Sequence, residues 1–304
     1  MGQHIIDAHA HLWLNVDTMV NGAPIHPLEP NRSRFLFFGE ERQMLPPWLT
    51  DGQNTAERFL SNMDYAQVSA AVITQEFIDG QQNSYLAQVQ QRWPDRFFCF
   101  GMPELRRPGF LDEARSLIHS GFRGIKVPAA RLPQRFLGDE MLQMLHLMEQ
   151  HDIILGIELM DGDAQVGQLE EALQECPRLR VAIGHFGMVT RPGWLSQIRL
   201  ARHDNVYIES GGITWLFNDE FYPFPTAVRA IREAADEVGM EKLMWGSDYP
   251  RTITAITYRM SYDFVSKSAE LTADEKRLFL CDNARRFFGF GNLVELPYIK
   301  NMSE

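Results

Sequence analysis

The sequence predicts an α/β fold, a single (β/α)8 barrel, on the strength of three observations. The chain has 304 residues, which suits one barrel with insertions better than one ordinary domain. Short apolar runs alternate with amphipathic stretches along almost its whole length. The glycine-rich phosphate turn that an open doubly wound sheet usually carries after its first strand is missing. We therefore expect one barrel domain over residues 1–304.

Eight β-branched or apolar runs are the strand candidates, and eight strand–helix units close into a parallel barrel. In chain order the runs are His4–Ala8, Ala70–Thr74, Phe97–Phe100, Gly124–Val127, Ile153–Glu158, Arg180–Gly184, Val206–Glu209 and Leu243–Gly246. Helical patterns lie between them, such as Pro108–His119 and Glu140–Glu149, where apolar residues recur at i, i+3, i+4 and i+7. One more helix is predicted over residues 272–290, beyond the eighth strand–helix unit.

Two stretches interrupt the alternation. Asn15–Gly52 follows the first strand, is rich in Pro, Asn, Phe and Trp, and is too long for a simple strand-to-helix loop. Thr214–Pro225 follows the seventh strand and is rich in aromatic residues. Barrel active sites form at the carboxyl ends of the strands, so both stretches are candidates for lids or specificity walls. The alternative is that they are surface loops or subunit contacts.

The composition narrows the class of partner. A formal net charge of −11 argues against nucleic acid, because phosphate binding needs a basic face. No apolar run approaches the roughly 20 residues of a membrane span, and the first residues lack a secretory signal pattern. Cys99, Cys176 and Cys281 form no CxxC pair and are typical of buried thiols in a reducing compartment. We expect a cytoplasmic protein with a small-molecule partner, and a homodimer as the commonest assembly.

The strongest local motif is the pair His9 and His11 at the end of the first apolar run. Side chains in a strand alternate, so both imidazoles project to the same side, here into the barrel mouth. Two neutral imidazoles at this spacing can bind one divalent cation. The alternative is two polar residues at a strand end, without a ligand.

Two further motifs place polar side chains at strand ends. Asp248 follows the eighth strand after Gly246, which permits close approach, and can serve as a metal ligand and as the base that deprotonates a water molecule. Its structural alternative is to cap the helix that follows Pro250. His185 follows the sixth strand between two glycines and is a candidate electrophile or acid/base, and possible metal ligand, instead of a core histidine.

In their order and spacing these motifs resemble the amidohydrolase-related (amidohydrolase 2) family of the amidohydrolase superfamily. The matching segments are IIDAHAH, VAIGHFG, LMWGSDYP and NARRFFG, at residues 5–11, 181–187, 243–250 and 283–289. The resemblance spans the whole chain. It implies a distorted TIM barrel and, in many members, a zinc or similar divalent ion. It also implies one of two reactions, opening of a lactone or decarboxylation of an aromatic or unsaturated carboxylic acid.

The chain departs from the decarboxylase branch at the fifth strand, where that branch has a metal-binding histidine. Here Glu158 stands at the strand end, and His151 lies at the opposite end. Glu158 is expected either to bind the metal, since carboxylates bind the same ions, or to hydrogen-bond a ligand. We expect one divalent ion, zinc or manganese; the alternative, which some lactonase relatives suggest, is a metal-free mechanism.

Four residues near strand ends are candidates for substrate contacts: Lys126 at the end of the fourth strand, Arg251 beyond Asp248, Arg191 beyond His185, and Trp13. Guanidinium groups suit an acidic substrate because they bind carboxylates through two parallel hydrogen bonds. The alternatives are a structural ion pair for Lys126 and solvated charges for the two arginines. Glu209, which ends the seventh strand, is a candidate for orienting a ligand.

Two reactions therefore remain open. In the first, a lactone or similar cyclic ester is hydrolysed: the metal or the histidines polarise the carbonyl, Asp248 activates water, and His185 stabilises the oxyanion. In the second, Arg251 or Lys126 and the metal hold a carboxylate while Asp248 or His185 protonates a carbon atom. The missing fifth-strand histidine favours hydrolysis, whereas GSDYP and NARRFFG favour decarboxylation.

Two other classes are disfavoured by the sequence. A non-catalytic binding barrel would have broken ligands, yet His9, His11, His185 and Asp248 are all present. A serine-nucleophile hydrolase of the α/β-hydrolase kind would carry a GxSxG elbow, and the chain has none. We therefore expect an amidohydrolase-superfamily enzyme, with lactone hydrolysis first and decarboxylation second.

Overall fold

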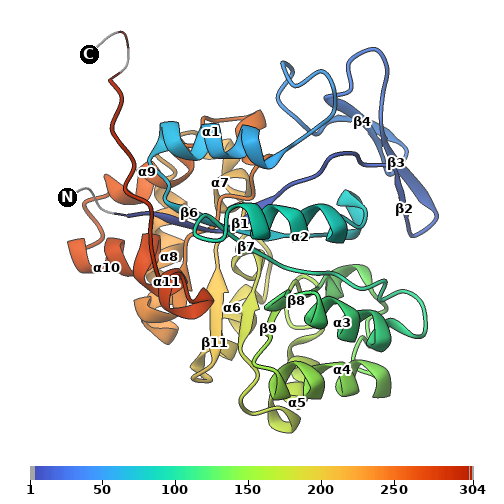
Figure 1. Cartoon of the computed structure of the whole chain (residues 1–304). Helices are drawn as coiled ribbons and strands as arrows, with labels where there is room; N and C mark the ends of the chain where they lie inside the picture. Colours follow the sequence, from blue (N-terminus) through green and yellow to red (C-terminus); the bar gives the residue numbers. More distant parts are fainter. Residues whose placement is uncertain (1–3, 301, 303–304) are drawn as a thin grey trace.

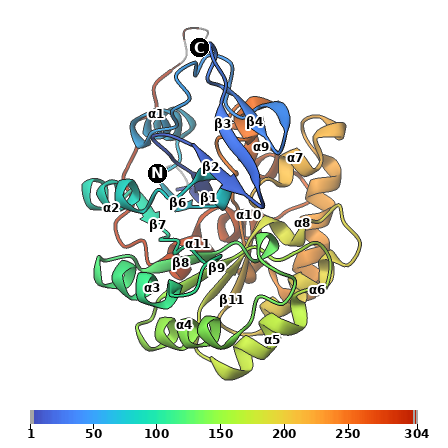
Figure 2. The same cartoon turned by 90° about the vertical axis from the view of Figure 1, so that its right-hand side faces the viewer.

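The structure, a computed structural model, describes residues 4–300 and 302. Eight parallel strands form a ring at its centre, and Figures 1 and 2 show helices around these strands. In chain order they are β1 (Ile6–His11), β6 (Ala70–Thr74), β7 (Phe97–Cys99), β8 (Gly124–Val127), β9 (Ile154–Ile157), β10 (Val181–Ile183), β11 (Val206–Glu209) and β12 (Leu243–Met244). The strands from β8 to β12 form one sheet, and β1, β6 and β7 form another. Four strands are one or two residues shorter than predicted and three have the predicted bounds, whereas β1 begins two residues later and reaches His11.

The two sheets meet through isolated backbone contacts instead of continuous ladders. On one side Gly101, just beyond β7, pairs with Ile125 of β8. On the other side the Ala8 amide of β1 donates to the Trp245 carbonyl beyond β12, at 2.8 Å. These contacts complete the ring in the order of the chain. The fold is therefore the distorted (β/α)8 barrel that the sequence predicted.

Helices surround the ring (Figures 1 and 2). They are α1 (Ala56–Ala66), α2 (Asn83–Arg92), α3 (Phe110–His119), α4 (Asp139–Gln150), α5 (Val166–Glu175), α6 (Trp194–Arg199), α7 (Ile213–Leu216), α8 (Pro225–Val238), α9 (Met260–Ser266), α10 (Ala273–Arg277) and α11 (Asn283–Phe288). Both helices that the apolar spacing predicted are present, as α3 and α4. Over the part of the chain that the structure describes, no helix combines the length and apolarity needed to cross a membrane.

Residues 15–52, the stretch too long for a simple strand-to-helix loop, form a small antiparallel sheet. Its strands are β2 (Thr18–Val20), β3 (Ala23–Pro27), β4 (Arg34–Phe37) and β5 (Glu40–Gln43), paired in chain order. Two tight turns connect the outer pairs. Asn21 and Gly22 have φ of 51° and 79°, and Phe38 and Gly39 have φ of 52° and 86°. Two successive positive φ angles are typical of the type I′ hairpin turn, for which Asn-Gly is a favoured pair.

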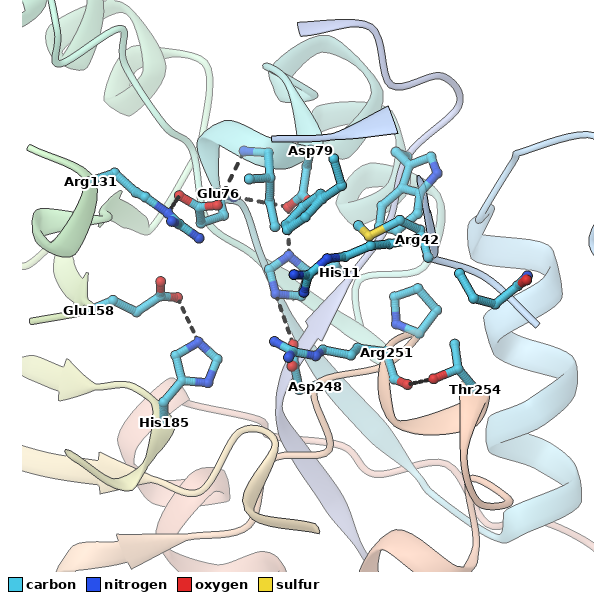
Figure 3. Close-up of a pocket in the computed structure, with 16 residues that line it drawn as sticks. His11, Arg42, Glu76, Asp79, Arg131, Glu158, His185, Asp248, Arg251 and Thr254 are labelled. Atoms are coloured by element: carbon cyan, nitrogen blue, oxygen red, sulfur yellow. Dashed lines mark hydrogen bonds and ion pairs between the residues drawn. The ribbon is translucent and has the colours of Figure 1, made fainter. Parts of the chain in front are cut away.

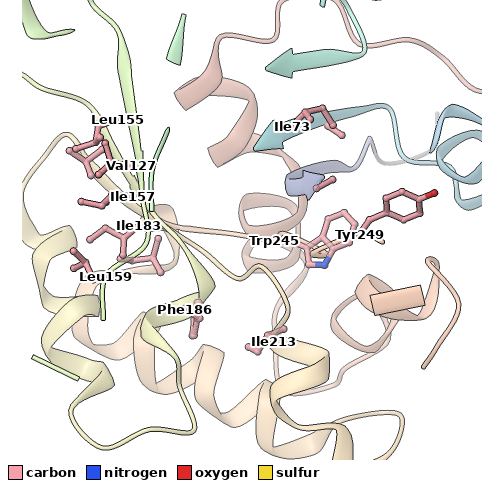
Figure 4. Packing of buried hydrophobic residues seen from close by; sticks show 14 of the residues in the cluster. Ile73, Val127, Leu155, Ile157, Leu159, Ile183, Phe186, Ile213, Trp245 and Tyr249 are labelled. Carbon is pink, nitrogen blue, oxygen red and sulfur yellow. The ribbon is translucent and has the colours of Figure 1, made fainter. Parts of the chain in front are cut away.

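Two apolar layers hold the barrel together. Outside the strands, Val127, Ile157 and Ile183 lie on neighbouring strands and pack under the surrounding helices (Figure 4). Inside the ring, Phe98 and Phe100 of the β7 segment fill the space beside the glycines of β8 and β9. A fully buried aromatic side chain contributes about 2–3 kcal/mol through removal of its surface from water. The interior is therefore packed below the mouth, which leaves only the strand ends for a site.

The predicted C-terminal helix closes the opposite end of the barrel. It consists of α10, a π-helical turn η8 (Leu278–Asp282) and α11. Phe288 of α11 lies 5.1 Å from Phe98 and 6.1 Å from Phe100, measured between ring centroids. Residues Asn283–Gly289 thus cover the amino ends of the strands, at the opposite end of the barrel from the mouth.

An irregularity in β1 turns both motif histidines inward. The register with β6 shifts between Asp7 and Ala10, where β1 has one residue more than its partner. Such a bulge reverses which side chains face inward. Ile6 and Ala8 accordingly belong to the inner layer, whereas Ala10 belongs to the outer one. His9 and His11 therefore face the mouth of the barrel, although strict alternation would place them on the side opposite Ile6 and Ala8.

Candidate functional site

The two histidines of β1 converge on one point. The Nε2 atoms of His9 and His11 are 3.0 Å apart. The Nδ1 atom of His9 hydrogen-bonds Glu209 at the end of β11, and the Nδ1 atom of His11 hydrogen-bonds Asp79, each at 2.6 Å. A carboxylate on Nδ1 fixes the ring orientation and leaves Nε2 as the coordinating atom. This is the arrangement by which carboxylates hold metal-binding histidines.

A positive charge between the facing Nε2 atoms of His9 and His11 would stabilise their arrangement. If both Nδ1 atoms carry protons, two Nε2 lone pairs meet at 3.0 Å and repel each other. Burial lowers the pKa of His9, and it also opposes charge on His11. The carboxylates of Asp79 and Asp248 nevertheless raise the pKa of His11 well above its usual range. The site thus favours one positive charge here, which a proton or a divalent cation can supply.

Asp248 completes a three-donor group with the histidines. Its Oδ1 atom lies 3.3 Å from His11 Nε2 and 3.6 Å from His9 Nε2. Its Oδ2 atom accepts a hydrogen bond from Trp215 Nε1 at 2.7 Å. Burial raises the pKa of Asp248, but the three surrounding histidines outweigh burial and hold it below its usual range. Two nitrogens and a carboxylate oxygen suit zinc or manganese.

The interpretation of Asp248 as a helix cap is wrong. The next helical turn, η7 (Thr252–Thr254), has no side-chain cap, and the Asp248 side chain points into the mouth. The Asp248 backbone has φ of 57°, a region that non-glycine residues rarely adopt and that recurs at functional sites. Gly246 is needed nearby, because a Cβ atom there would lie 2.7 Å from His9 Cβ.

His185 faces the same space from the end of β10. Its Nδ1 atom lies 2.9 Å from the Gly211 carbonyl oxygen, and its Nε2 atom lies 3.4 Å from Glu158 Oε1. Burial lowers the pKa of His185, but the charges of Glu158, Asp248 and Glu209 raise it to about 9. At neutral pH the ring is then an imidazolium, which can donate a proton or stabilise an oxyanion.

Glu158 lies beside this group, at the end of β9, and pairs with Lys126. Lys126 Nζ is 2.6 Å from Glu158 Oε1, and both side chains are buried. Burial raises the pKa of Glu158, but Lys126 and His185 hold it well below its usual range. With His9 and His185, Glu158 forms a second group of donors close enough to share an ion. Lys126 reaches this carboxylate and is not among the residues that line the cavity.

Apart from His9, which lies behind them, these donors line a cavity of about 240 Å³ (Figure 3). The antiparallel insertion forms part of the wall, so residues 15–52 do contribute to the candidate site. The lining residues are His11, Trp13, Phe37, Arg42, Gln43, Met44, Glu76, Ile78, Asp79, Arg131, Glu158, His185, Asp248, Pro250, Arg251 and Thr254. Trp13, a predicted substrate contact, is buried in this wall and donates through Nε1 to the Gly52 carbonyl at 3.0 Å.

Three rim arginines, Arg42, Arg131 and Arg251, extend over the cavity (Figure 3). Arg131 Nε lies 3.1 Å from the buried carboxylate of Glu76, whose pKa is raised by burial. Arg251, a candidate substrate contact from the sequence, lines the cavity. Arg191 is not in the cavity wall; it lies 3.4 Å from Asp161, and more than half of its side chain is exposed. The observed rim can bind an anion by bidentate hydrogen bonds.

Several residues of the candidate site were not predicted from the sequence. Glu76 and Asp79 follow β6 and form a capping box around η1 (Phe77–Asp79). Their signal was available, since they follow the second strand at its carboxyl end, where barrel sites form. Arg42 and Arg131 had no such signal, because their positions depend on how the insertion and the loop after β8 fold.

Residues 6–290 match the family described as Amidohydrolase. None of the curated proteins matches the sequence. Among solved structures, similarity extends to a probable 2-pyrone-4,6-dicarboxylic acid hydrolase from Acinetobacter baumannii with citric acid bound. The TM-score is 0.70 and the identity 21%, over 94% of this chain and 100% of that one.

Two other solved structures have the same fold. An amidohydrolase from Burkholderia multivorans with bound zinc has a TM-score of 0.68 and 16% identity, over 94% of this chain and 99% of that one. The 5-carboxyvanillate decarboxylase from Novosphingobium aromaticivorans, complexed with manganese and a nitrobenzoic acid, has a TM-score of 0.53 and 20% identity, over 77% and 80% of the two chains. Identities this low establish the shared fold only.

Proposed function

Because the chain belongs to the amidohydrolase family, we propose that it is a metal-dependent hydrolase that opens a lactone or similar cyclic ester of a small acidic molecule. One observation carries the proposal: His9 Nε2, His11 Nε2 and Asp248 Oδ1 converge within 3.0 to 3.6 Å of one another under a cavity with an arginine rim. The buried donors supply the chemistry, and the rim supplies recognition of negative charge.

The donors that would hold one divalent ion, zinc before manganese, are His9, His11 and Asp248. Glu158 and His185 form a second group of donors, which shares only His9 with this set. When bound, such an ion polarises a carbonyl oxygen and makes attack by water easier. Glu209 and Asp79 support this assignment, because each holds one histidine with Nε2 facing the shared point.

In the proposed reaction Asp248 is the general base. It takes a proton from the attacking water, whose oxygen forms the new bond to the carbonyl carbon. The ring C–O bond of the ester then breaks, and the same proton passes to the leaving alkoxide. The products are one carboxylic acid and one hydroxyl group on a single opened molecule, and the acid releases its proton to solvent to become a carboxylate. The left-handed backbone of Asp248 and its contact with Trp215 fix the carboxylate for both transfers.

His185 stabilises the charge that develops on the carbonyl oxygen. As an imidazolium held by the Gly211 carbonyl and Glu158, it presents a positive edge to the cavity without reorganisation. Arg131 and Arg251 would hold an acidic substituent of the substrate at the rim. Lys126 serves as the counter-charge of Glu158 and keeps that carboxylate ionised.

Non-oxidative decarboxylation is the second candidate, and His185 is the observation that favours it. A histidine with a pKa of about 9 is protonated at neutral pH and could donate its proton to a carbon atom that loses CO2. The rim arginines would then hold the departing carboxylate. Glu158 at the end of β9, in place of a histidine, still favours hydrolysis.

The two reactions release different products and can be separated directly. Purified protein loaded with Zn²⁺ would be offered carboxylated lactones, with acid release followed in a pH-stat, and hydroxybenzoic acids, with CO2 measured. We expect acid release from a lactone and none with Asp248→Asn. Release of CO2 with no lactone opening would reject hydrolysis in favour of the second candidate.

A further inference from the structure

Trp215 holds the proposed base from outside the cavity wall. It belongs to α7, in the aromatic stretch after β11, and its Nε1–H donates to Asp248 Oδ2 at 2.7 Å. The indole lies directly over Gly212, where a Cβ atom would approach Nε1 to 1.9 Å. Gly212 also has φ of 74°, which favours glycine. The chain is thus shaped to place this indole against Asp248.

The whole segment 209–215 has the same orienting role. Glu209 holds His9 at 2.6 Å, the Gly211 carbonyl holds His185 at 2.9 Å, and Trp215 holds Asp248. One short stretch of chain therefore fixes three side chains that come from β1, β10 and the end of β12. A displacement of this stretch would disturb all three together.

The face of the same indole supports Arg251. The guanidinium carbon lies 3.7 Å from the centroid of the Trp215 ring, a cation–π contact. Among the residues that the structure describes, no acidic side chain forms an ion pair with Arg251. Its guanidinium is exposed in the cavity wall, with donors available to an anion. Arg42 and Arg131, in contrast, already contact Glu40 and Glu76.

We propose that Trp215 is a positioning residue that couples anion recognition to the reacting group. Its N–H fixes Asp248 with Oδ1 toward the histidines, and its ring face fixes Arg251 in the wall of the same cavity. The ligand class is an organic acid whose carboxylate pairs with Arg251 while its reacting carbonyl meets the donors at the cavity bottom. This inference rests on the proposed function, in which Asp248 binds the metal ion and serves as base.

The two halves of the proposal have separate readouts. Trp215→Phe keeps a ring under Arg251 but removes the N–H, so the affinity for Zn²⁺ should fall by about 10–100-fold, the usual effect of losing a partner of a metal ligand. Trp215→Leu removes the ring face as well. It should also weaken binding of the probe benzene-1,3-dicarboxylate by about fivefold or more, as expected for loss of a partly desolvated cation–π contact.

Trp93 offers a matched control. It also has an arginine over its ring, with Arg92 at 4.3 Å from the centroid, but it follows α2 and is not among the residues that line the cavity. Zn²⁺ affinity by competition with a chelating dye, and dicarboxylate binding by calorimetry on the zinc-loaded protein, would be measured for wild type, Trp215→Phe, Trp215→Leu and Trp93→Phe. We expect Trp93→Phe to match wild type in both.

Each result decides between alternatives. Weaker Zn²⁺ binding in Trp215→Phe, with dicarboxylate binding kept, supports the coupling. If wild type binds Zn²⁺ and Trp215→Phe binds it equally well, Trp215 only packs against Asp248, and the inference is overturned while the proposed function stands. If wild type takes up no Zn²⁺, both are overturned. Equal dicarboxylate binding by wild type and Trp215→Leu overturns the role of the ring face.

Discussion

The bottom and the rim of the cavity are built in different ways. The floor donors, His9, His11 and Asp248, have side chains no more than 9% exposed, and each has a second hydrogen-bond partner. The rim arginines come from the insertion and from loops, and the side chain of Arg42 is 56% exposed. The floor therefore has one fixed geometry, whereas the rim can adjust to a ligand.

This difference separates chemistry from recognition. Carboxylates and an indole hold the buried donors in place. Because these side chains lose their conformational entropy during folding, they need no rearrangement when a substrate binds. Exposed guanidinium groups keep side-chain freedom that binding must remove. Changes at the floor should therefore alter metal affinity and turnover, and changes at the rim should alter substrate affinity.

The largest effect is expected from Asp248→Asn. The amide cannot accept the proton of water, so kcat should fall by about 10²–10⁴-fold, the range typical of a lost general base. Steady-state kinetics on the zinc-loaded variant would measure it, and an unchanged circular dichroism spectrum would show that the fold is intact. Turnover within threefold of wild type would remove Asp248 from the proposed mechanism.

A smaller effect is expected from Asp79→Asn, because Asp79 contacts the proposed metal ligand His11 and not the ion itself. The amide can still accept from His11 Nδ1 but no longer supplies the negative charge beside it. We expect Zn²⁺ affinity to fall by about 10–100-fold, as for other partners of metal-binding histidines. Chelator competition measures it. Unaltered affinity would mean that Asp79 only caps η1.

At the rim, Arg251→Gln tests the other half of the comparison. Loss of a charged hydrogen-bond donor should raise KM for an acidic substrate by about 10–100-fold, with kcat changed much less. Arg191→Gln is a suitable control, because Arg191 lies outside the cavity wall. A fall in kcat as large as that of Asp248→Asn would contradict the separation of floor from rim.

The smallest effect is expected far from both regions, from Glu275→Gln. Glu275 accepts from Arg232 and from its own cap residue Thr272, and these contacts lower its pKa from 4.5 to about 2. Its stabilisation is present above pH 4.5 and lost as the pH falls toward 2. At pH 7 the free energy of unfolding of the variant should be about 1 kcal/mol lower than that of wild type. Thermal melts should show that the stability difference between variant and wild type shrinks below pH 4.5. The Zn²⁺ affinity should be unchanged. A stability difference that stays constant with pH would contradict this role of Glu275.

Much of the floor could be predicted from the sequence, because it depends on local order along the chain. Parallel strands align their carboxyl ends, so a polar residue just after an apolar run is placed at the mouth whatever the loops do. His185, Asp248 and Glu158 reached the mouth for this reason, whereas His9 and His11 also needed the bulge in β1 to face inward. Glu209 could be found in the same way, and its contact with His9 gives it the orienting position that we expected.

The rest depended on features that strand order does not reveal. The bulge in β1 changes which residues face inward, and no residue in IIDAHAH marks it. The fold of residues 15–52, which places Arg42 in the wall, follows from hairpin turns whose signal, Asn21-Gly22, is short and common. The contact between Trp215 and Asp248 joins residues 33 positions apart and follows from tertiary packing alone.

The most direct test of the central claim is the metal content per chain, measured by inductively coupled plasma mass spectrometry on protein purified without chelators. Wild type and His9→Ala would be compared before and after incubation with Zn²⁺ and Mn²⁺. We predict about one equivalent in wild type, as for a mononuclear site, and loss of that metal in the variant. A wild-type protein that stays empty after addition of either ion, or a variant that keeps its metal, would contradict the assignment of His9, His11 and Asp248 as a metal site.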